Sequence, residues 1–107
     1  MRTSVVLIVV AAIVLSVTSA AWSFECPARI EEAKKAIEKA EAALDKAKAA
    51  ARAGARGPLN KAKEMLSHAE AEHKGAGQDV KKHAEAVREA RTAQGYAEEA
   101  RIIAEKF

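Results

Sequence analysis

Apolar residues recur at helical spacing along most of the chain, with charged residues between them. After Pro27 they follow one another in steps of three and four residues, the pattern of one helix face that packs against neighbouring helices. The positions on this face are Ile30, Ala33, Ile37, Ala40, Leu44, Ala47 and Ala51. Abundant alanine and few turn residues also favour helix. The pattern therefore predicts a first long helix that begins near Pro27.

Glycine and proline mark the expected helix boundaries in the middle of the chain. Gly54 and the pair Gly57-Pro58 are residue types that commonly end one helix and begin another. We therefore expect the first helix to end in this stretch and a second helix to follow it. The inner face of the second helix repeats the spacing with Leu59, Ala62, Leu66, Ala69 and His73.

A further break predicts that the chain reverses direction after the second helix. Gly75 and Gly77 permit a tight turn, and Asp79 is a candidate cap for the start of a third helix. The inner face of that helix is expected to carry Val80, His83, Val87, Ala90 and Gln94. Gly95 interrupts the pattern and predicts a short fourth helix. Its inner face would carry Tyr96, Ala97, Ala100, Ile103, Ala104 and Phe107.

The helical segments also resemble one another, which indicates an internal repeat. Residues 39–46 align with residues 61–68 at an offset of 22, and these align with residues 82–89 at an offset of 21. Short links between such helices favour antiparallel neighbours, and alanine at the contact positions lets helices approach closely. The sequence predicts an all-α fold for residues 24–107: a small antiparallel helical bundle of three long helices plus a short fourth.

The N-terminal residues have the pattern of a secretory signal peptide. Residues 5–17 are almost wholly apolar, follow Arg2, and precede small residues that end at Ser23. We expect residues 1–23 to be removed and the protein to be exported to the periplasm. The alternative is an uncleaved anchor in the inner membrane, because residues 5–22 span 18 positions and a membrane helix needs about 17–25. Only in that case would the protein contact the membrane.

Charge and motif content disfavour several classes of function. Residues 24–107 hold 17 basic and 15 acidic residues in close alternation, so binding of nucleic acid is not predicted. The glycines fall at expected helix breaks, and Cys26 has no histidine near it in the sequence, so the chain is not predicted to be an enzyme. As the single cysteine, Cys26 is either a free thiol or an intermolecular disulfide. Self-association would use Cys26 or the alanine-rich helix faces.

One repeat carries the motif of a known family. Its defining positions are Lys61, Ala62, Glu64, Leu66 and His68. With the alanine-rich repeat, the export signal and the chain length, this motif resembles the small metal-binding protein (SmbP) family of periplasmic four-helix bundles. The resemblance implies binding of divalent metals such as copper by histidines that recur seven residues apart. This chain matches that pattern at His68, whereas His83 is displaced by one residue. At the other positions where the family pattern places a histidine, this chain has Lys39, Lys46, Lys61, Lys82 and Glu89.

A smaller metal site is predicted from the expected hairpin. If the chain reverses near residue 76, His68 lies one position from facing His83, and His73 faces Asp79. Three imidazoles and a carboxylate would suit Cu(II), Ni(II) or Zn(II), so the predicted metal ligands are His68, His73, His83 and Asp79. The alternative is that His73 and His83 fill polar positions of the helix faces and His68 lies on the surface. The protein would then be a metal-free structural or interaction module of the cell envelope.

Overall fold

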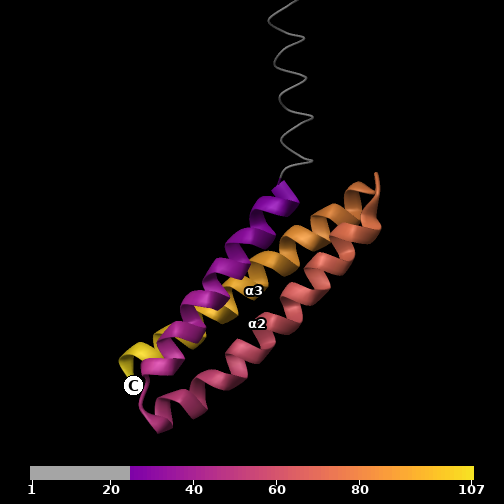
Figure 1. Ribbon diagram of the computed structural model, residues 1–107. Coiled ribbons are helices and arrows are strands. Elements are labelled where there is room, and N and C mark those ends of the chain that lie inside the picture. Colours follow the sequence, from indigo (N-terminus) through magenta and orange to yellow (C-terminus); the bar gives the residue numbers. More distant parts are fainter. Residues whose placement is uncertain (1–24) are drawn as a thin grey trace, which may run out of the picture.

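The computed structural model describes residues 25–107, which form three packed α-helices and no β-strand (Figure 1). One helix covers residues 25–46, called helix 25–46 below. It is followed by α2 (Ala49–Ala76) and α3 (Val80–Lys106). Successive helices run antiparallel, so both ends of the bundle are formed by short connections (Figure 1). The predicted signal peptide, residues 1–23, lies outside the described residues.

The predicted inner face of the first helix is confirmed from Ile30 to Leu44, whereas Ala47 lies in the bend after the helix and Ala51 belongs to α2. The buried positions of helix 25–46 are Cys26, Ile30, Ala33, Ile37, Ala40 and Leu44. The inner faces of the other two helices are mostly alanine: Ala51, Ala55, Leu59, Ala62, Ala69 and Ala76 on α2, and Ala86, Ala90, Ala93, Ala97, Ala100 and Ala104 on α3. Because a methyl group is small, these faces bring the helix backbones close together. The few large apolar side chains of the core come chiefly from helix 25–46.

The predicted helix boundary at residues 54–58 is wrong. Instead, α2 is continuous through Gly57 and Pro58, and the chain bends at residues 47–48. Buried residues continue across the proline from Ala55 to Leu59, so packing against the other two helices holds this segment helical. Proline in a helix interior costs about 3 kcal/mol. Tertiary burial outweighs that local preference here.

The bend at residues 47–48 is stabilised by a side chain from α2. The Arg52 guanidinium donates hydrogen bonds to the carbonyl oxygens of Leu44 at 3.0 Å, Asp45 at 3.4 Å and Ala47 at 3.2 Å. The last carbonyls of a helix have no partner within the helix. Arg52 therefore caps the end of helix 25–46 from the start of the next helix.

Replacing Arg52 with alanine is expected to destabilise the bundle by about 0.5–2 kcal/mol, the usual cost of losing a helix cap. Urea denaturation followed by circular dichroism would measure the change. Arg56→Ala is the matched control, because Arg56 is exposed one turn further along α2. Equal stability of the two variants would contradict the capping role.

The turn between α2 and α3 agrees with the prediction. Gly77 has a φ of 54°, a conformation that glycine adopts without strain. Asp79 then caps α3, since its Oδ1 accepts hydrogen bonds from the backbone amides of Lys81 at 3.0 Å and Lys82 at 3.3 Å. The reversal places the last turn of α2 beside the first turn of α3.

The predicted short fourth helix is wrong, because α3 runs unbroken through Gly95 to Lys106. Glycine costs only about 1 kcal/mol in a helix, and Gly95 lies on the exposed face. The predicted inner face of α3 is also partly wrong: Ala90 is buried, but Val80 is 65% exposed. Alanines occupy the interior of α3 because the close approach of three helices leaves little room for larger side chains.

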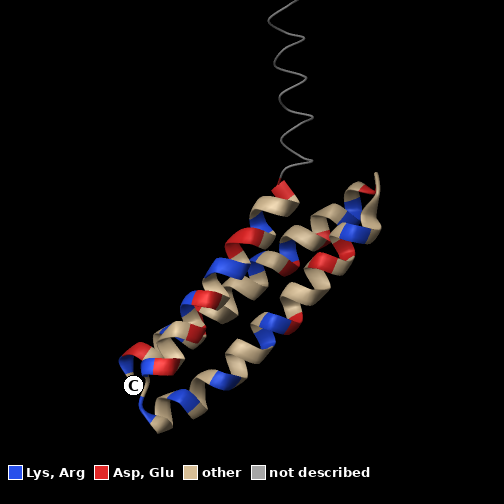
Figure 2. Ribbon diagram, in the orientation of Figure 1, with Lys and Arg blue, Asp and Glu red and all other residues tan. Residues whose placement is uncertain are grey.

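Acidic and basic residues both occur along all three helices (Figure 2). Most ion pairs join residues three or four positions apart, as between Arg29 and Glu32 at 3.0 Å. The pair between Lys63 and Glu41, at 2.8 Å, joins α2 to helix 25–46. Within residues 25–107, no helix has the length and apolar character that crossing a membrane requires.

Candidate metal centre

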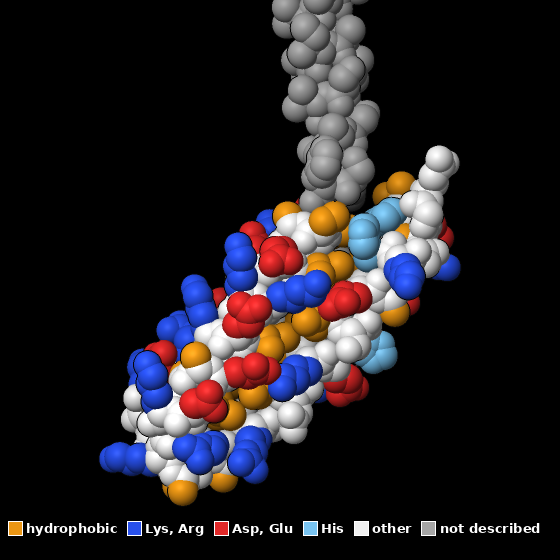
Figure 3. Space-filling model, in the orientation of Figure 1, with side chains coloured by type: hydrophobic (Ala, Val, Ile, Leu, Met, Phe, Trp, Pro, Cys, Tyr) orange, Lys and Arg blue, Asp and Glu red, His pale blue; other side chains and the backbone are white. Residues whose placement is uncertain are grey.

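Three side chains with metal-binding atoms meet at the end of the bundle that carries the α2–α3 turn. They are Cys26 in helix 25–46, next to the first described residue, His73 in the last turn of α2 and His83 in the first turn of α3. One sulfur and one nitrogen from each ring all lie within 4.8 Å of one another. Histidine side chains gather at this end of the molecular surface (Figure 3). Each helix thus contributes one donor atom.

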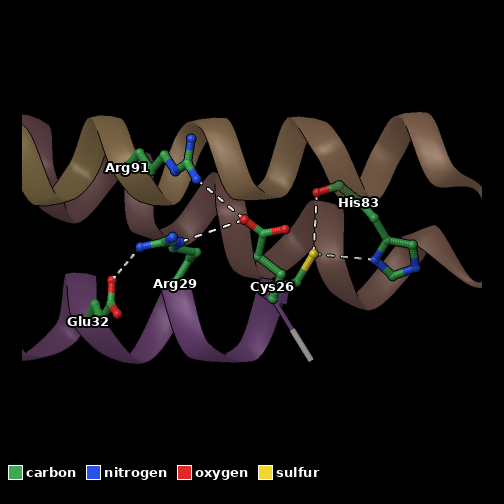
Figure 4. Close-up of polar contacts among 6 residues, drawn as sticks. Cys26, Arg29, Glu32, His83 and Arg91 are labelled. Carbon is green, nitrogen blue, oxygen red and sulfur yellow. Dashed lines mark hydrogen bonds and ion pairs between the residues drawn. The ribbon is translucent and has the colours of Figure 1, made fainter. Parts of the chain in front are cut away.

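Cys26 is held against His83 in a buried position. Its Sγ lies 3.5 Å from His83 Nδ1, and its S–H donates to the His83 carbonyl oxygen at 3.3 Å (Figure 4). The cysteine is only 1% exposed. Burial raises the pKa of the Cys26 thiol, and the negative charge of Glu25 raises this pKa further. The sulfur is therefore a neutral thiol at neutral pH, before any metal displaces its proton.

The ring of His83 is oriented by the turn. Its Nε2 lies 2.8 Å from the carbonyl oxygen of Gly77. A carbonyl oxygen can only accept, so this contact assigns the ring proton to Nε2 and leaves the Nδ1 lone pair facing Cys26. Histidine ligands of metals commonly donate their second N–H to a carbonyl in this way. The backbone at Gly77 therefore prepares His83 Nδ1 as a ligand.

His73 completes the group from α2. Its ring centroid lies 5.6 Å from that of His83, with the ring planes inclined at 60°. Its Nδ1 is buried and has no hydrogen-bond partner within the described residues. Leaving a buried polar atom unpaired costs about 1–3 kcal/mol, a cost that metal coordination or a bound water would remove. An open hollow of about 330 Å³ lies beside the ring, between Pro27, Ile30 and Glu70.

The structure brings together two of the four residues predicted as ligands, His73 and His83. His68 lies elsewhere on α2: its side chain is 61% exposed, and its Nε2 is 4.0 Å from Glu64. It lies five positions before His73, which places the two side chains about 140° apart around a helix of 3.6 residues per turn. Asp79 is engaged in capping α3. Cys26 is the additional donor that the sequence analysis did not include.

The pattern around Cys26 contains a signal that could have identified it. Cys26 precedes Ile30 by four positions and therefore continues the buried face of Ile30, Ala33 and Ile37. Along the sequence Cys26 has no nearby histidine, because His83 is 57 positions away. The return of the chain in the bundle brings these two residues into contact.

A network of charges fixes the start of helix 25–46 on α3. The Glu25 carboxylate is 3.3 Å from the Arg91 guanidinium and 3.8 Å from that of Arg29 (Figure 4). Arg29 also pairs with Glu32. Because these groups are partly exposed, the ion pairs contribute little to stability. They do hold the residue before Cys26 in a defined place beside α3.

Comparison of the chain with protein-family models, curated proteins and solved structures found no match. The chemistry of the site therefore rests on its own donor set. One thiolate sulfur and two imidazole nitrogens are ligands that zinc and copper accept. Their placement on three helices means that a bound ion would connect all three at this end of the bundle.

Proposed function

We propose that this protein binds a transition-metal ion of the copper, nickel or zinc type in the cell envelope and does so without catalysis. The observation that carries the proposal is the convergence of Cys26, His73 and His83, one from each helix, with all three donor atoms within 4.8 Å. The unpaired Nδ1 of His73 adds support, since coordination of a metal ion would give this buried atom a partner. The SmbP-like repeat is consistent with the same function.

The proposed location rests on the N-terminal residues. The apolar run at residues 5–17 and the small residues that follow it favour export through a signal peptide. A cell-envelope location fits a metal-binding protein, because metal ions that enter the cell pass through the envelope before they reach the cytoplasm. Intact mass measurement of the protein recovered from the periplasm tests this part: loss of residues 1–23 is expected.

Replacing any one of the three donors is expected to weaken metal binding. We predict saturable binding of one ion. The variants Cys26→Ser, His73→Gln and His83→Gln should each lower the affinity by at least about 100-fold. Loss of a residue that only hydrogen-bonds to a ligand already costs up to about 100-fold. Isothermal titration with Cu(II), Ni(II) and Zn(II) measures this. His68→Gln is the matched control, because His68 is a histidine of α2 that lies outside the group.

Two results would contradict the proposal. One is binding no tighter than micromolar for every metal tested. The other is unchanged affinity when Cys26, His73 and His83 are replaced together. In either case the protein would be a metal-free helical module, whose contacts with other proteins would then involve exposed residues such as Ile102 and Phe107.

Metal binding is expected to release a proton from the Cys26 thiol. Burial and Glu25 raise the pKa of this thiol, so its proton is still bound at neutral pH and must leave when the sulfur coordinates a metal. The apparent affinity should therefore rise about tenfold per pH unit from pH 7 until the raised pKa is reached. Calorimetry in buffers of different ionisation enthalpy measures the released proton.

The same pKa shift has the opposite consequence for the metal-free protein. A thiol whose pKa is raised by folding favours the folded state while it is protonated. That contribution is fully present below the unfolded pKa and is lost as pH rises through the folded pKa. Metal-free protein should thus lose stability at alkaline pH, and Cys26→Ser should remove that loss.

An affinity for metal that does not change with pH above 7 would contradict coordination by the Cys26 thiolate.

A further inference from the structure

Resting on the proposed function, we propose that the centre formed by Cys26, His73 and His83 is a three-coordinate copper(I) site. Its ligands are the Cys26 sulfur, the Nδ1 of His83 and a ring nitrogen of His73. The donor set alone is compatible with both zinc and copper. The proposal specifies the metal, its oxidation state and its coordination number.

The number of available donors favours copper(I) over zinc. Zinc is almost always at least four-coordinate and, when held by three protein ligands, takes a water as the fourth, whereas the group of neighbouring donors found within residues 25–107 has three members. No carboxylate of residues 25–107 belongs to this group, and two carboxylates near it in the sequence have other partners. Glu25 pairs with Arg29 and Arg91, and Asp79 caps α3. Copper(I) is a soft d¹⁰ ion that is stable with three ligands, and thiolate ligands select for it.

The charge of the centre points in the same direction. One thiolate and one copper(I) ion form a neutral unit, whereas a divalent ion would leave a net positive charge beside the buried Cys26. An uncompensated charge in a poorly solvated position is costly. The Glu25 carboxylate beside Cys26 is shared with two cations, Arg29 and Arg91. The hollow beside His73 is lined by as many basic as acidic residues: Lys34, Lys74, Glu31 and Glu70. These surroundings give little compensation for an additional positive charge.

Coordination of copper(I) requires a single proton transfer. The S–H bond of Cys26 breaks, a sulfur–copper bond forms, and the proton passes to solvent; neither copper nor sulfur changes oxidation state. His83 needs no rearrangement, because the Gly77 carbonyl already holds the ring proton on Nε2. The lone pair of His83 Nδ1, which faces the Cys26 thiol in the metal-free protein, then coordinates the metal. The buried Nδ1 of His73 has no hydrogen-bond partner among the described residues, so coordination through it would break no existing hydrogen bond.

The test is a competition between copper(I) and zinc under anaerobic conditions. The full-length protein is loaded with Zn(II), equimolar copper(I) is added from a chromophoric chelator, and the released zinc is measured. Complete displacement of zinc is expected, with X-ray absorption showing one sulfur and two nitrogen neighbours around copper. Cys26→Ser should lower copper(I) affinity more than about 100-fold and lower zinc affinity less. His68→Gln should behave as the unaltered protein does.

The outcomes separate this inference from the proposed function. If zinc binds through Cys26, His73 and His83 and copper(I) fails to displace it, the copper(I) assignment is overturned and metal binding stands. If neither ion binds, both fall. Equal copper(I) affinity of Cys26→Ser also overturns the assignment. His73→Gln serves as a second variant, because the half-buried His73 tolerates substitution better than Cys26; circular dichroism verifies that each variant is folded.

Discussion

Saturation with metal is expected to raise the melting temperature of this protein by about 10–20 °C. At a free metal concentration 100 times the Kd, binding stabilises the folded state by about 2.7 kcal/mol. For a domain of this size, each kcal/mol shifts the melting temperature by about 4–8 °C. The effect is expected because the three ligands come from three helices, so unfolding any one helix end removes a ligand. Circular dichroism melts with and without metal measure the shift.

The variants of this experiment distinguish coordination at the centre from adventitious binding. His68→Gln should keep the full shift, because the exposed His68 lies outside the group. Cys26→Ser and His83→Gln should lose most of it. An equal shift in Cys26→Ser would show that metal stabilises the protein at another place. A shift that requires His68 would favour the ligand set that the sequence predicted, which includes His68.

The first helix could be predicted from sequence because it carries large apolar residues. Ile30, Ile37 and Leu44 recur on one face, and all three are buried. On α3 the interior consists of alanine, which also occurs on exposed positions such as Ala84. Hydropathy therefore favoured Val80 and Val87 as interior residues, whereas the close approach of the helices selects small side chains. The rotation of α3 depends on that approach, which a single sequence does not display.

The helix boundaries show the competition between local preference and packing. Gly57 and Pro58 have the strongest local tendency to break a helix, yet α2 passes through them. The actual bend, at residues 47–48, contains alanine and lysine and no glycine or proline. It is stabilised by Arg52, whose contacts with three carbonyl groups exist only once the two helices are packed.

Two of the three residues of the candidate centre could be predicted from the sequence and the third could not, for a related reason. His73 and His83 belong to one hairpin with a recognisable turn, so their proximity follows from the spacing around Gly77. Cys26 reaches them only through the register of helix 25–46 against that hairpin. This register is set by the bend at residues 47–48, which the sequence does not mark.

The alanine interior yields the second large expected effect: Ala62→Leu should lower the melting temperature by about 5–20 °C. Ala62 is fully buried in the cluster that includes Leu44, Leu59 and Ala100. Adding side-chain volume to a packed core costs about 1–3 kcal/mol, and each kcal/mol corresponds to about 4–8 °C. The small chain has little stability in reserve, since domains are stable by only about 5–15 kcal/mol. Thermal denaturation of the metal-free variant measures the loss.

Ala53→Leu on the same helix is the matched control, because Ala53 is exposed and should tolerate leucine within about 0.5 kcal/mol. If both variants had the same melting temperature, the close approach of the helices at Ala62 would be refuted.

The Ala62→Leu variant also tests whether the metal centre is independent of the alanine core. Ala62 belongs to a different part of the core from Cys26, His73 and His83, and effects of separated sites add. The stabilisation by metal should thus be the same in Ala62→Leu as in the unaltered protein. A smaller stabilisation would mean that the alanine contacts set the position of Cys26 relative to the two histidines.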